Sequence, residues 1–443
     1  MQKDTFKISI LILLIGGFIT KIMGFVIKIL FTRMIGSEGL SLYTLAMPTY
    51  SLMISIAIFA LPISISKLVS EGGRRSSDII LSTTLFILLF NLIFIIIFLF
   101  LIPFISEYLL HEPNIKLILI AMLSTLPFIS ISSILKGYFL GKLKVLPNTL
   151  SNIIEQTIRI IFLLYLFPKI LLINNYLGLL SFILISIITE TISTIVFLLF
   201  LPKKTNINLK KRNFEPSIIK EVLNTSIPAL SSRLIGNIAF FLEPIILTNI
   251  LLLMGYTTSY IQSEYAIFNA YVIGILTMPS FFIAAICQIL IPEVSKYSSL
   301  NNKVMLKRRI SQALKYSFII GLISSFLILI FRDNLLNILY KTTSGSNYIL
   351  LLAPVFTLFY LEAPLTSTLQ AMGHAKESAK ITLIGSIIKL STMALTSLLK
   401  IGMYSLLISE IINIFYVVIK SAKTLKKEGK FYENSSRTWK SRQ

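Results

Sequence analysis

Apolar runs of about 20 residues recur along almost the entire chain, and each is long enough to cross the hydrocarbon core of a bilayer. The sequence has 443 residues, of which 55% are hydrophobic and 14% are charged. The polar stretches between the runs are too short to fold as separate soluble domains. Because lipid alone can cover so much apolar surface, the sequence predicts an all-α protein that crosses the membrane many times.

About twelve transmembrane helices are expected. The predicted spans are 8–31, 42–66, 79–103, 117–138, 148–168, 177–201, 222–252, 265–291, 312–331, 348–371, 377–399 and 402–420. The first span carries lysines and has no small-residue cleavage site, so we expect it to be retained and not removed as a signal peptide. The seventh and eighth spans are longer than a bilayer requires, which predicts either tilt or a break.

Basic residues are distributed unevenly between the predicted loops. Of the 41 Lys and Arg residues, about 29 fall on the side that holds both termini and about 6 on the other, which is the positive-inside pattern. We therefore expect a multi-pass protein of the cell membrane with both termini in the cytoplasm. The basic runs, such as Lys307-Arg308-Arg309, are interpreted as topology signals that contact anionic membrane lipids. Nucleic acid is not an expected partner, because no basic face with stacking aromatic residues accompanies the net charge of +22.

The two halves of the sequence resemble one another in three places that occur in the same order. The matched segments are 21–24 with 233–236, the pair Pro48 and Pro62 with the pair Pro279 and Pro292, and 140–144 with 370–374. Because each half has an even number of spans, both copies enter the membrane from the same side, as in a parallel repeat.

This repeat predicts two six-helix lobes and their boundaries. We expect an N-terminal lobe at 1–201, a basic cytoplasmic linker at 202–218, a C-terminal lobe at 219–420 and a basic cytoplasmic tail at 421–443. The polar end of the tail, 431–443, is predicted to be disordered. Proline removes a backbone hydrogen bond, so the matched prolines are expected to bend both lobes alike, although prolines are also common in membrane helices.

The first span carries a stripe of small and basic residues. Gly17, Lys21, Gly24 and Lys28 fall on one helical face at about 100° per residue. Lys21 lies near the middle of the span and needs either a partner acid or a wet cavity, whereas Lys28 lies nearer the outer surface. With Arg233 at the matching place in the second half, the pattern predicts a central cavity that binds an anionic substrate. The glycines are expected to act as hinge or kink positions.

Acidic residues also occur within the spans. Glu155 and Arg159 are four residues apart and are predicted to form a structural ion pair. Glu243 is a candidate for binding a coupling cation or proton, and Glu362 is a further candidate if the substrate is a cationic drug. Other intramembrane charges, including Lys389 and Glu410, can be structural pairs.

The sequence lacks the patterns typical of several enzyme classes. No phosphate-binding loop, metal-ligand cluster or catalytic triad pattern is present, so we expect neither cofactor nor metal and no enzymatic activity. A membrane glycosyltransferase or polymerase remains an alternative, and it would depend on Glu107 or Glu112 in the outer loop that also holds His111. That loop is more simply explained as a solvated connection.

Three segments resemble the stage V sporulation protein B group of polysaccharide biosynthesis proteins, within the multidrug/oligosaccharidyl-lipid/polysaccharide exporter superfamily. They are Gly39 to Leu52, Leu61 to Glu71, and Lys136 to Gly141 continuing through Pro147, Ser151, Glu155-Gln156 and Arg159. The resemblance is specific over 1–160 and looser beyond, where mainly the order of spans agrees.

The resemblance implies a flippase for an undecaprenyl-diphosphate-linked saccharide, such as a precursor of cell-wall or spore-cortex peptidoglycan. It also implies alternating access of two lobes around a cationic cavity, and a monomeric transport unit. In related lipid II flippases basic residues of the first helix are needed, and Lys21 and Lys28 lie in the matching helix. Many members carry two further C-terminal helices, whereas twelve spans are predicted here. A cation-coupled multidrug exporter of the same superfamily is the first alternative function.

Overall fold

The computed structural model describes the backbone of residues 2–202, 215–300 and 302–440, with side chains outside 2–14, 232 and 428–440. The described residues form helices and no strand. Contacts group the chain into two compact units, Met1–Thr248 and Asn249–Gln443, and each is described separately. The predicted lobe boundary near 202–218 remains a prediction, since most of that linker lies outside the described residues.

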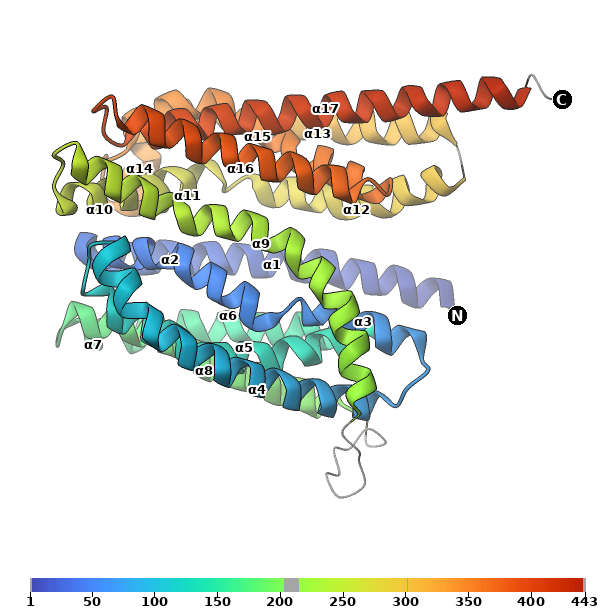
Figure 1. Cartoon of the computed structure of the whole chain (residues 1–443), viewed down its shortest axis with the longest axis horizontal. Helices are drawn as coiled ribbons and strands as arrows, with labels where there is room; N and C mark the ends of the chain where they lie inside the picture. Colours follow the sequence, from blue (N-terminus) through green and yellow to red (C-terminus); the bar gives the residue numbers. More distant parts are fainter. Residues whose placement is uncertain (1, 203–214, 301, 441–443) are drawn as a thin grey trace. The chain divides into compact units, whose positions relative to one another are not determined.

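The first unit holds ten helical segments among its described residues. They are α1 (Gln2–Met34), α2 (Gly36–Ile58), α3 (Leu61–Glu71), α4 (Ser76–Pro103), the π-helix η1 (Phe104–Leu109), α5 (Ile115–Gly141), α6 (Leu146–Tyr165), α7 (Phe167–Leu171), α8 (Asn175–Phe200) and α9 (Pro216–Leu253), whose last residues belong to the second unit (Figure 1). Helix α5 is central, because it packs against α2, α3, α4 and α8.

The described part of the second unit contains nine helical segments after α9. They are α10 (Thr258–Ala266), the π-helix η4 (Ile267–Val272), α11 (Ile273–Leu276), α12 (Ser280–Ser299), α13 (Lys303–Ile330), α14 (Arg332–Tyr340), α15 (Ser346–Ala371), α16 (Ala375–Ser397) and α17 (Tyr404–Lys440). Helix α15 has the role that α5 has in the first unit, packing against α12, α13 and α17.

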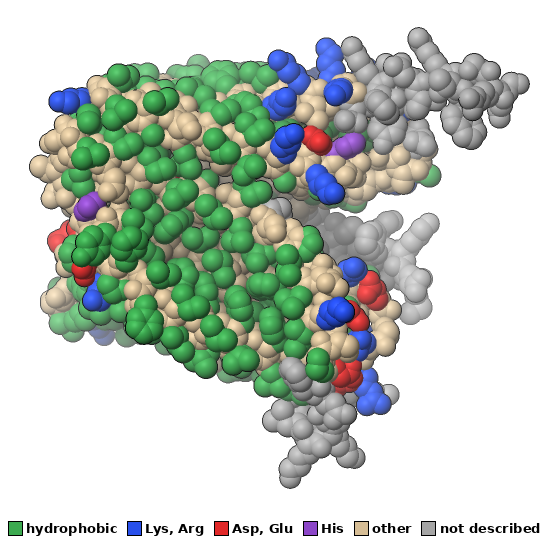
Figure 2. All heavy atoms as spheres, viewed as in Figure 1, with side chains coloured by type: hydrophobic (Ala, Val, Ile, Leu, Met, Phe, Trp, Pro, Cys, Tyr) green, Lys and Arg blue, Asp and Glu red, His purple; other side chains and the backbone are tan. Residues whose placement is uncertain are grey.

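Eleven helical segments in the described part of the chain are long and apolar enough to cross a membrane. Figure 2 shows hydrophobic side chains covering the visible lengths of the helices, with charged side chains gathered near their ends. The predicted fifth span is not among the eleven. It corresponds to α6, which has 20 residues but includes Glu155 and Arg159 and packs between α1 and α8. Several of its polar residues, among them Ser151 and Glu155, are buried.

Two spans are interrupted, but the matched prolines do not interrupt them at the same place. The second span breaks at Phe59 and Ala60, which have positive φ angles of 54° and 53°, and Pro62 lies in the first turn of the next helix, α3. Pro48 lies inside the continuous helix α2. In the second unit the break occupies 277–279 and ends at Pro279, whereas Pro292 lies inside α12. The helix breaks therefore fall at different members of the matched proline pairs, and bending of both halves by these prolines stays a prediction. The seventh span is one continuous helix, α9.

The break after α2 is stabilised by buried polar groups. Ser130 Oγ donates to the carbonyl oxygen of Ala57 at 3.0 Å, and Asn91 Nδ2 donates to Ser130 Oγ at 2.9 Å. The three residues come from α2, α5 and α4. A carbonyl that leaves the helical ladder needs such a partner, because hydrocarbon supplies none.

The ends of α5 and α15 share one capping geometry. The N–H of Lys144 donates to the Phe139 carbonyl at 2.9 Å, and the N–H of His374 donates to the Leu369 carbonyl at the same distance. Both are Schellman caps with one left-handed residue. That residue is Leu143 in the first unit, with φ of 55°, and Gly373 in the second, with φ of 89°. The sequence match between 140–144 and 370–374 therefore corresponds to matched structure.

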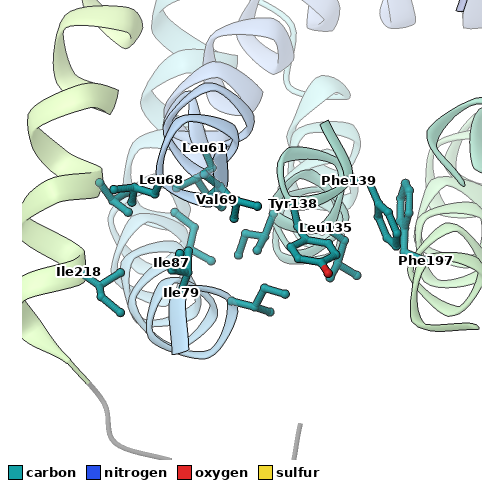
Figure 3. Close-up of a cluster of buried hydrophobic side chains, with 14 residues drawn as sticks. Leu61, Leu68, Val69, Ile79, Ile87, Leu135, Tyr138, Phe139, Phe197 and Ile218 are labelled. Atoms are coloured by element: carbon teal, nitrogen blue, oxygen red, sulfur yellow. The ribbon is translucent and has the colours of Figure 1, made fainter. Parts of the chain in front are cut away.

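Buried side chains at one end of the first unit join α9 to the helices before it. Ile218 and Val222 belong to a cluster with residues of α3, α4, α5 and α8 (Figure 3). Two ion pairs add to these apolar contacts: Arg74, in the loop before α4, pairs with Glu215 at 2.5 Å and with Glu221 at 2.6 Å. The two carboxylates raise the pKa of Arg74. The start of α9, which the sequence assigns to the linker up to 218 and to the second lobe from 219, thus packs against helices of the first unit.

The C-terminal segment is helical over most of the range predicted to be disordered. Helix α17 continues through Lys440, so the expectation of disorder is wrong for 431–440, while 441–443 lie outside the described residues. A helix already formed in the membrane continues at little cost, because only its nucleation is unfavourable.

The two Schellman caps provide a matched stability test. Replacing Leu143 by Gly should raise the free energy of unfolding by about 0.5–1 kcal/mol, because the left-handed strain of a branched residue exceeds the entropy cost of glycine. Gly373→Leu should lower it by a similar amount, since a Cβ there meets open space and only backbone strain changes. Equilibrium unfolding in SDS measures both, and equal shifts of the same sign would contradict this account.

Candidate functional site

The small and basic stripe of the first span lies on an open face of α1. A Cβ added at Gly17 or Gly24 would meet no atom within 4 Å. Lys21 is exposed and Lys28 is half-buried. Within the described part of the chain, neither lysine forms an ion pair. The stripe therefore presents two lysines without an ion pair among the described residues, beside glycines with open space around them.

Helix α9 repeats this arrangement at the matching position. Arg233 is exposed, and a Cβ added at Gly236, three residues later, would meet no atom within 4 Å. This is the same spacing as Lys21 and Gly24 in α1. Among the described residues Arg233 also has no ion pair. Whether these cations line one cavity between two lobes stays a prediction.

The interior of the first unit contains a second, balanced group of charges. Arg159 Nη2 lies 3.1 Å from Glu155 Oε1 on α6, the ion pair that the spacing predicts. Glu190 on α8 accepts a hydrogen bond from Ser132 and interacts electrostatically with Lys136 on α5. The two acids and two bases compensate one another, which distinguishes this group from the stripe on α1.

Sequence reasoning did not find the role of Lys136. In the sequence Lys136 belongs only to a segment of the family resemblance. Its interaction with Glu190 cannot be inferred from spacing, because Glu190 is 54 positions away and on another helix. Tyr50 adds to the same polar interior, with its hydroxyl 2.8 Å from Thr125 Oγ1. The signal that could have revealed Lys136 is its position in a predicted span that otherwise lacks charge.

The remaining acidic candidates are Glu243 in the first unit and Glu362 and Glu410 in the second. In the second unit Lys389 Nζ lies 2.6 Å from Glu410 Oε2, joining α16 to α17, and Glu362 on α15 interacts electrostatically with both. Glu243 on α9 is 3% exposed and has an interaction partner. Glu243 is therefore buried within α9. Its role in binding a coupling ion stays a prediction.

The loop at 104–116 holds His111 together with Glu107 and Glu112, the two acids on which a glycosyltransferase would depend. Glu107 is exposed on η1, His111 has a φ of 51°, and Glu112 Oε1 accepts a hydrogen bond from the Asn114 N–H at 3.2 Å. The described residues contain no cluster of three or more His, Cys, Asp or Glu side chains placed to hold a metal ion. The loop arrangement therefore offers no specific support for the glycosyltransferase alternative.

Comparison with known proteins gives consistent matches. The family model described as polysaccharide biosynthesis protein matches residues 7–298. Stage V sporulation protein B of Bacillus subtilis (strain 168) is 30% identical over 402 residues, which cover 88% of this chain and 77% of that protein. Lipid II flippase MurJ of the same organism is 27% identical over 170 residues, covering 34% of this chain and 30% of MurJ.

Solved structures show the same fold. An inward-facing multidrug resistance MATE family transporter of the MOP superfamily superimposes with a TM-score of 0.74 at 16% identity, covering 94% of this chain and 96% of the other. A MOP superfamily transporter from Pyrococcus furiosus, described by the reverse polarity of its binding pocket, gives 0.65 at 14% identity over 97% and 96% of the two chains. At these identities the likeness establishes the fold, which is that of MOP superfamily transporters.

Removing one partner of the α6 ion pair tests its structural role. Arg159→Gln should lower the free energy of unfolding by about 3 kcal/mol, because Glu155 is left buried without its counter-charge. Glu155→Gln combined with Arg159→Gln should recover most of that loss. The control is Lys67→Gln, which breaks an exposed i,i+4 pair with Glu71 and should change stability by less than about 0.5 kcal/mol. Equal losses at both sites would contradict this role.

Proposed function

The chain belongs to the polysaccharide biosynthesis protein family, and from this membership we propose that it is a flippase for an undecaprenyl-diphosphate-linked saccharide. The substrate would be a precursor of peptidoglycan, of spore cortex or of another polysaccharide. The names of two relatives, stage V sporulation protein B and lipid II flippase MurJ, support this class of substrate. The fold of MOP superfamily transporters is compatible with alternating access as its mechanism.

The observation that carries the proposal is the uncompensated charge on α1 and α9. Lys21 and Arg233 are exposed, and neither has an ion pair among the described residues. A bare cation within a span is costly unless water or an anion compensates it. Lys and Arg are the side chains that recognise phosphate groups, with Arg able to bind two oxygens at once. A diphosphate matches this pattern better than a cationic drug does.

The proposed cycle assigns a role to each element of the stripe. Lys21 and Arg233 bind the diphosphate in the inward-open state, and Lys28 assists nearer the outside. The open face at Gly17, Gly24 and Gly236 leaves room for the headgroup, while the prenyl tail stays in the bilayer. Rocking of the two lobes then exposes the headgroup outside, with Pro48, Pro62, Pro279 and Pro292 as hinge or kink positions. An inside-negative potential helps, since moving each negative charge outward gains about 2.3 kcal/mol per 100 mV.

Energy coupling is assigned to the buried acids. Glu243 is the candidate for a coupling cation or proton, because it is buried in α9 and belongs to the same helix as Arg233. Glu362 would take this role in the alternative function of a multidrug exporter. The transport unit is proposed to be a monomer with both termini in the cytoplasm, where basic loops contact anionic lipids.

A proteoliposome assay of lipid-linked saccharide translocation tests the site. Lys21→Gln and Arg233→Gln should each slow translocation by about tenfold or more, because each removes a charge-assisted contact with phosphate. Lys21→Arg should retain most activity, since the charge is kept. Arg75→Gln, at an exposed position outside the spans, is the matched control and should leave the rate unchanged. Wild-type rates for both stripe variants would refute the assignment.

Cysteine labelling tests the proposed orientation. In a Cys287→Ser background, Thr343→Cys should react with a membrane-impermeant maleimide in intact cells, because the Lys and Arg distribution predicts that the loop between α14 and α15 lies outside. Ser299→Cys, at the opposite end of the second unit's helices, should react only after permeabilisation. Both positions are exposed in the structure. The reverse labelling pattern would show that the charge distribution has been misinterpreted.

A further inference from the structure

A cavity of about 810 Å³ lies within the second unit. Its walls come from the end of α12 and from α13, α15 and α17, which pack against one another in this unit (Figure 1). Most of the lining is hydrocarbon, including Leu306, Ile310, Leu314, Phe318, Leu361 and Leu365. A cavity of this size and character suits an apolar chain and not a solvated polar group.

Lysines are the charged groups in the lining. Lys303, Lys307 and Lys315 line the cavity from α13, Lys426 lines it from α17, and the lining residues include no Asp or Glu. The three lysines of α13 recur with Ser311 at every fourth position, so they form a stripe about 18 Å long on one side of the helix. The cavity therefore combines an apolar interior with an excess of positive charge.

The ammonium group of Lys303 differs from those of the other lining lysines in its burial. Lys303 Nζ is shielded from solvent and has no hydrogen-bond partner among the described residues. The acid nearest in sequence on α12, Glu293, is paired with Arg309 Nε at 2.6 Å. A buried ammonium group without a hydrogen-bond acceptor is costly, so its surroundings call for an anionic ligand.

We propose that this cavity binds an anionic phospholipid of the cytoplasmic leaflet. A fatty acyl chain lies among α13, α15 and α17, and the phosphate contacts Lys303 and Lys307, with Lys315 and Lys426 adding to the positive potential. The first turn of α13 follows a loop that the charge distribution places in the cytoplasm, where anionic headgroups concentrate. None of the residues that line this cavity belongs to the stripe on α1, and the proposal does not depend on flippase activity.

A phospholipid fits better than the proposed transport substrate. The lining offers few hydroxyl groups to a saccharide, namely those of Tyr297, Ser298 and Ser311. A polyprenyl carrier chain is also several times longer than a fatty acyl chain, whereas the cavity is confined to the helices of one unit. Polyprenyl phosphate also combines a phosphate group with a hydrocarbon chain, so it is the competing ligand that the experiment must exclude.

Native mass spectrometry of the full chain, titrated with phosphatidylglycerol or phosphatidylcholine, tests the proposal. The wild type should retain one phosphatidylglycerol and bind phosphatidylcholine at least tenfold more weakly. The double variant Lys303→Gln with Lys307→Gln should lose about fivefold in affinity for each lysine removed. The matched control, Lys376→Gln with Lys380→Gln, removes two exposed lysines near the start of α16 that do not line the cavity, and should bind as the wild type does.

A second variant tests the apolar part of the site. Ala422→Phe places a ring into the lining from α17 while keeping every lysine, so retention of phosphatidylglycerol should fall although the charge is unchanged. Thermal unfolding and size-exclusion profiles like those of the wild type show that this variant folds. Equal binding of the two phospholipids, equal losses in the control, or displacement by stoichiometric undecaprenyl phosphate would overturn the proposal, whatever the result of the translocation assay.

Discussion

Hydrocarbon offers no hydrogen-bond partners, so every backbone N–H and C=O group within the membrane must form its hydrogen bond inside the protein. The rest of this structure depends on that constraint. The breaks in the helices follow from it. After α2 the chain passes through two left-handed residues, where Ser130 Oγ donates to the carbonyl of Ala57 and Asn91 Nδ2 donates to Ser130 Oγ. Because such a network must be built from several helices, an interruption can occur only where the packing supplies polar side chains.

The same constraint sorts the charged residues into two groups. Glu155 with Arg159, and Lys389 with Glu410, compensate one another at hydrogen-bond distance. Lys21 and Arg233 are not compensated in this way by described residues, and glycines leave their surroundings open. The structural pairs neutralise charge within each unit, whereas we propose that the exposed cations beside open backbone are where a phosphate group replaces water. This contrast gives a physical basis for separating the proposed site from the structural charges.

Much of the fold could be predicted from periodicity and charge. The spans, their order and the matched ends of α5 and α15 follow from local patterns, since helix length and capping depend on neighbouring residues. The predictions that failed depend on more distant residues. Helix α6, which the sequence predicts as the fifth span, is not among the eleven apolar spans, and its contacts with α1 and α8 appear only in the tertiary structure. The breaks could not be placed from prolines alone, because a proline within a membrane helix interrupts it only where other helices bind the freed groups.

The sequence by itself determined that the chain is a many-spanning membrane protein, that α1 and α9 carry matching basic positions, and that Glu155 can pair with Arg159 on one helical face. Each of these properties depends on residues within a few turns of one another. Only the tertiary structure decided which charges are compensated, which glycines face open space, and that lysines of α13 and α17 surround an apolar cavity. These properties depend on helices that are distant in sequence, because burial and charge compensation are set by the helices that pack together.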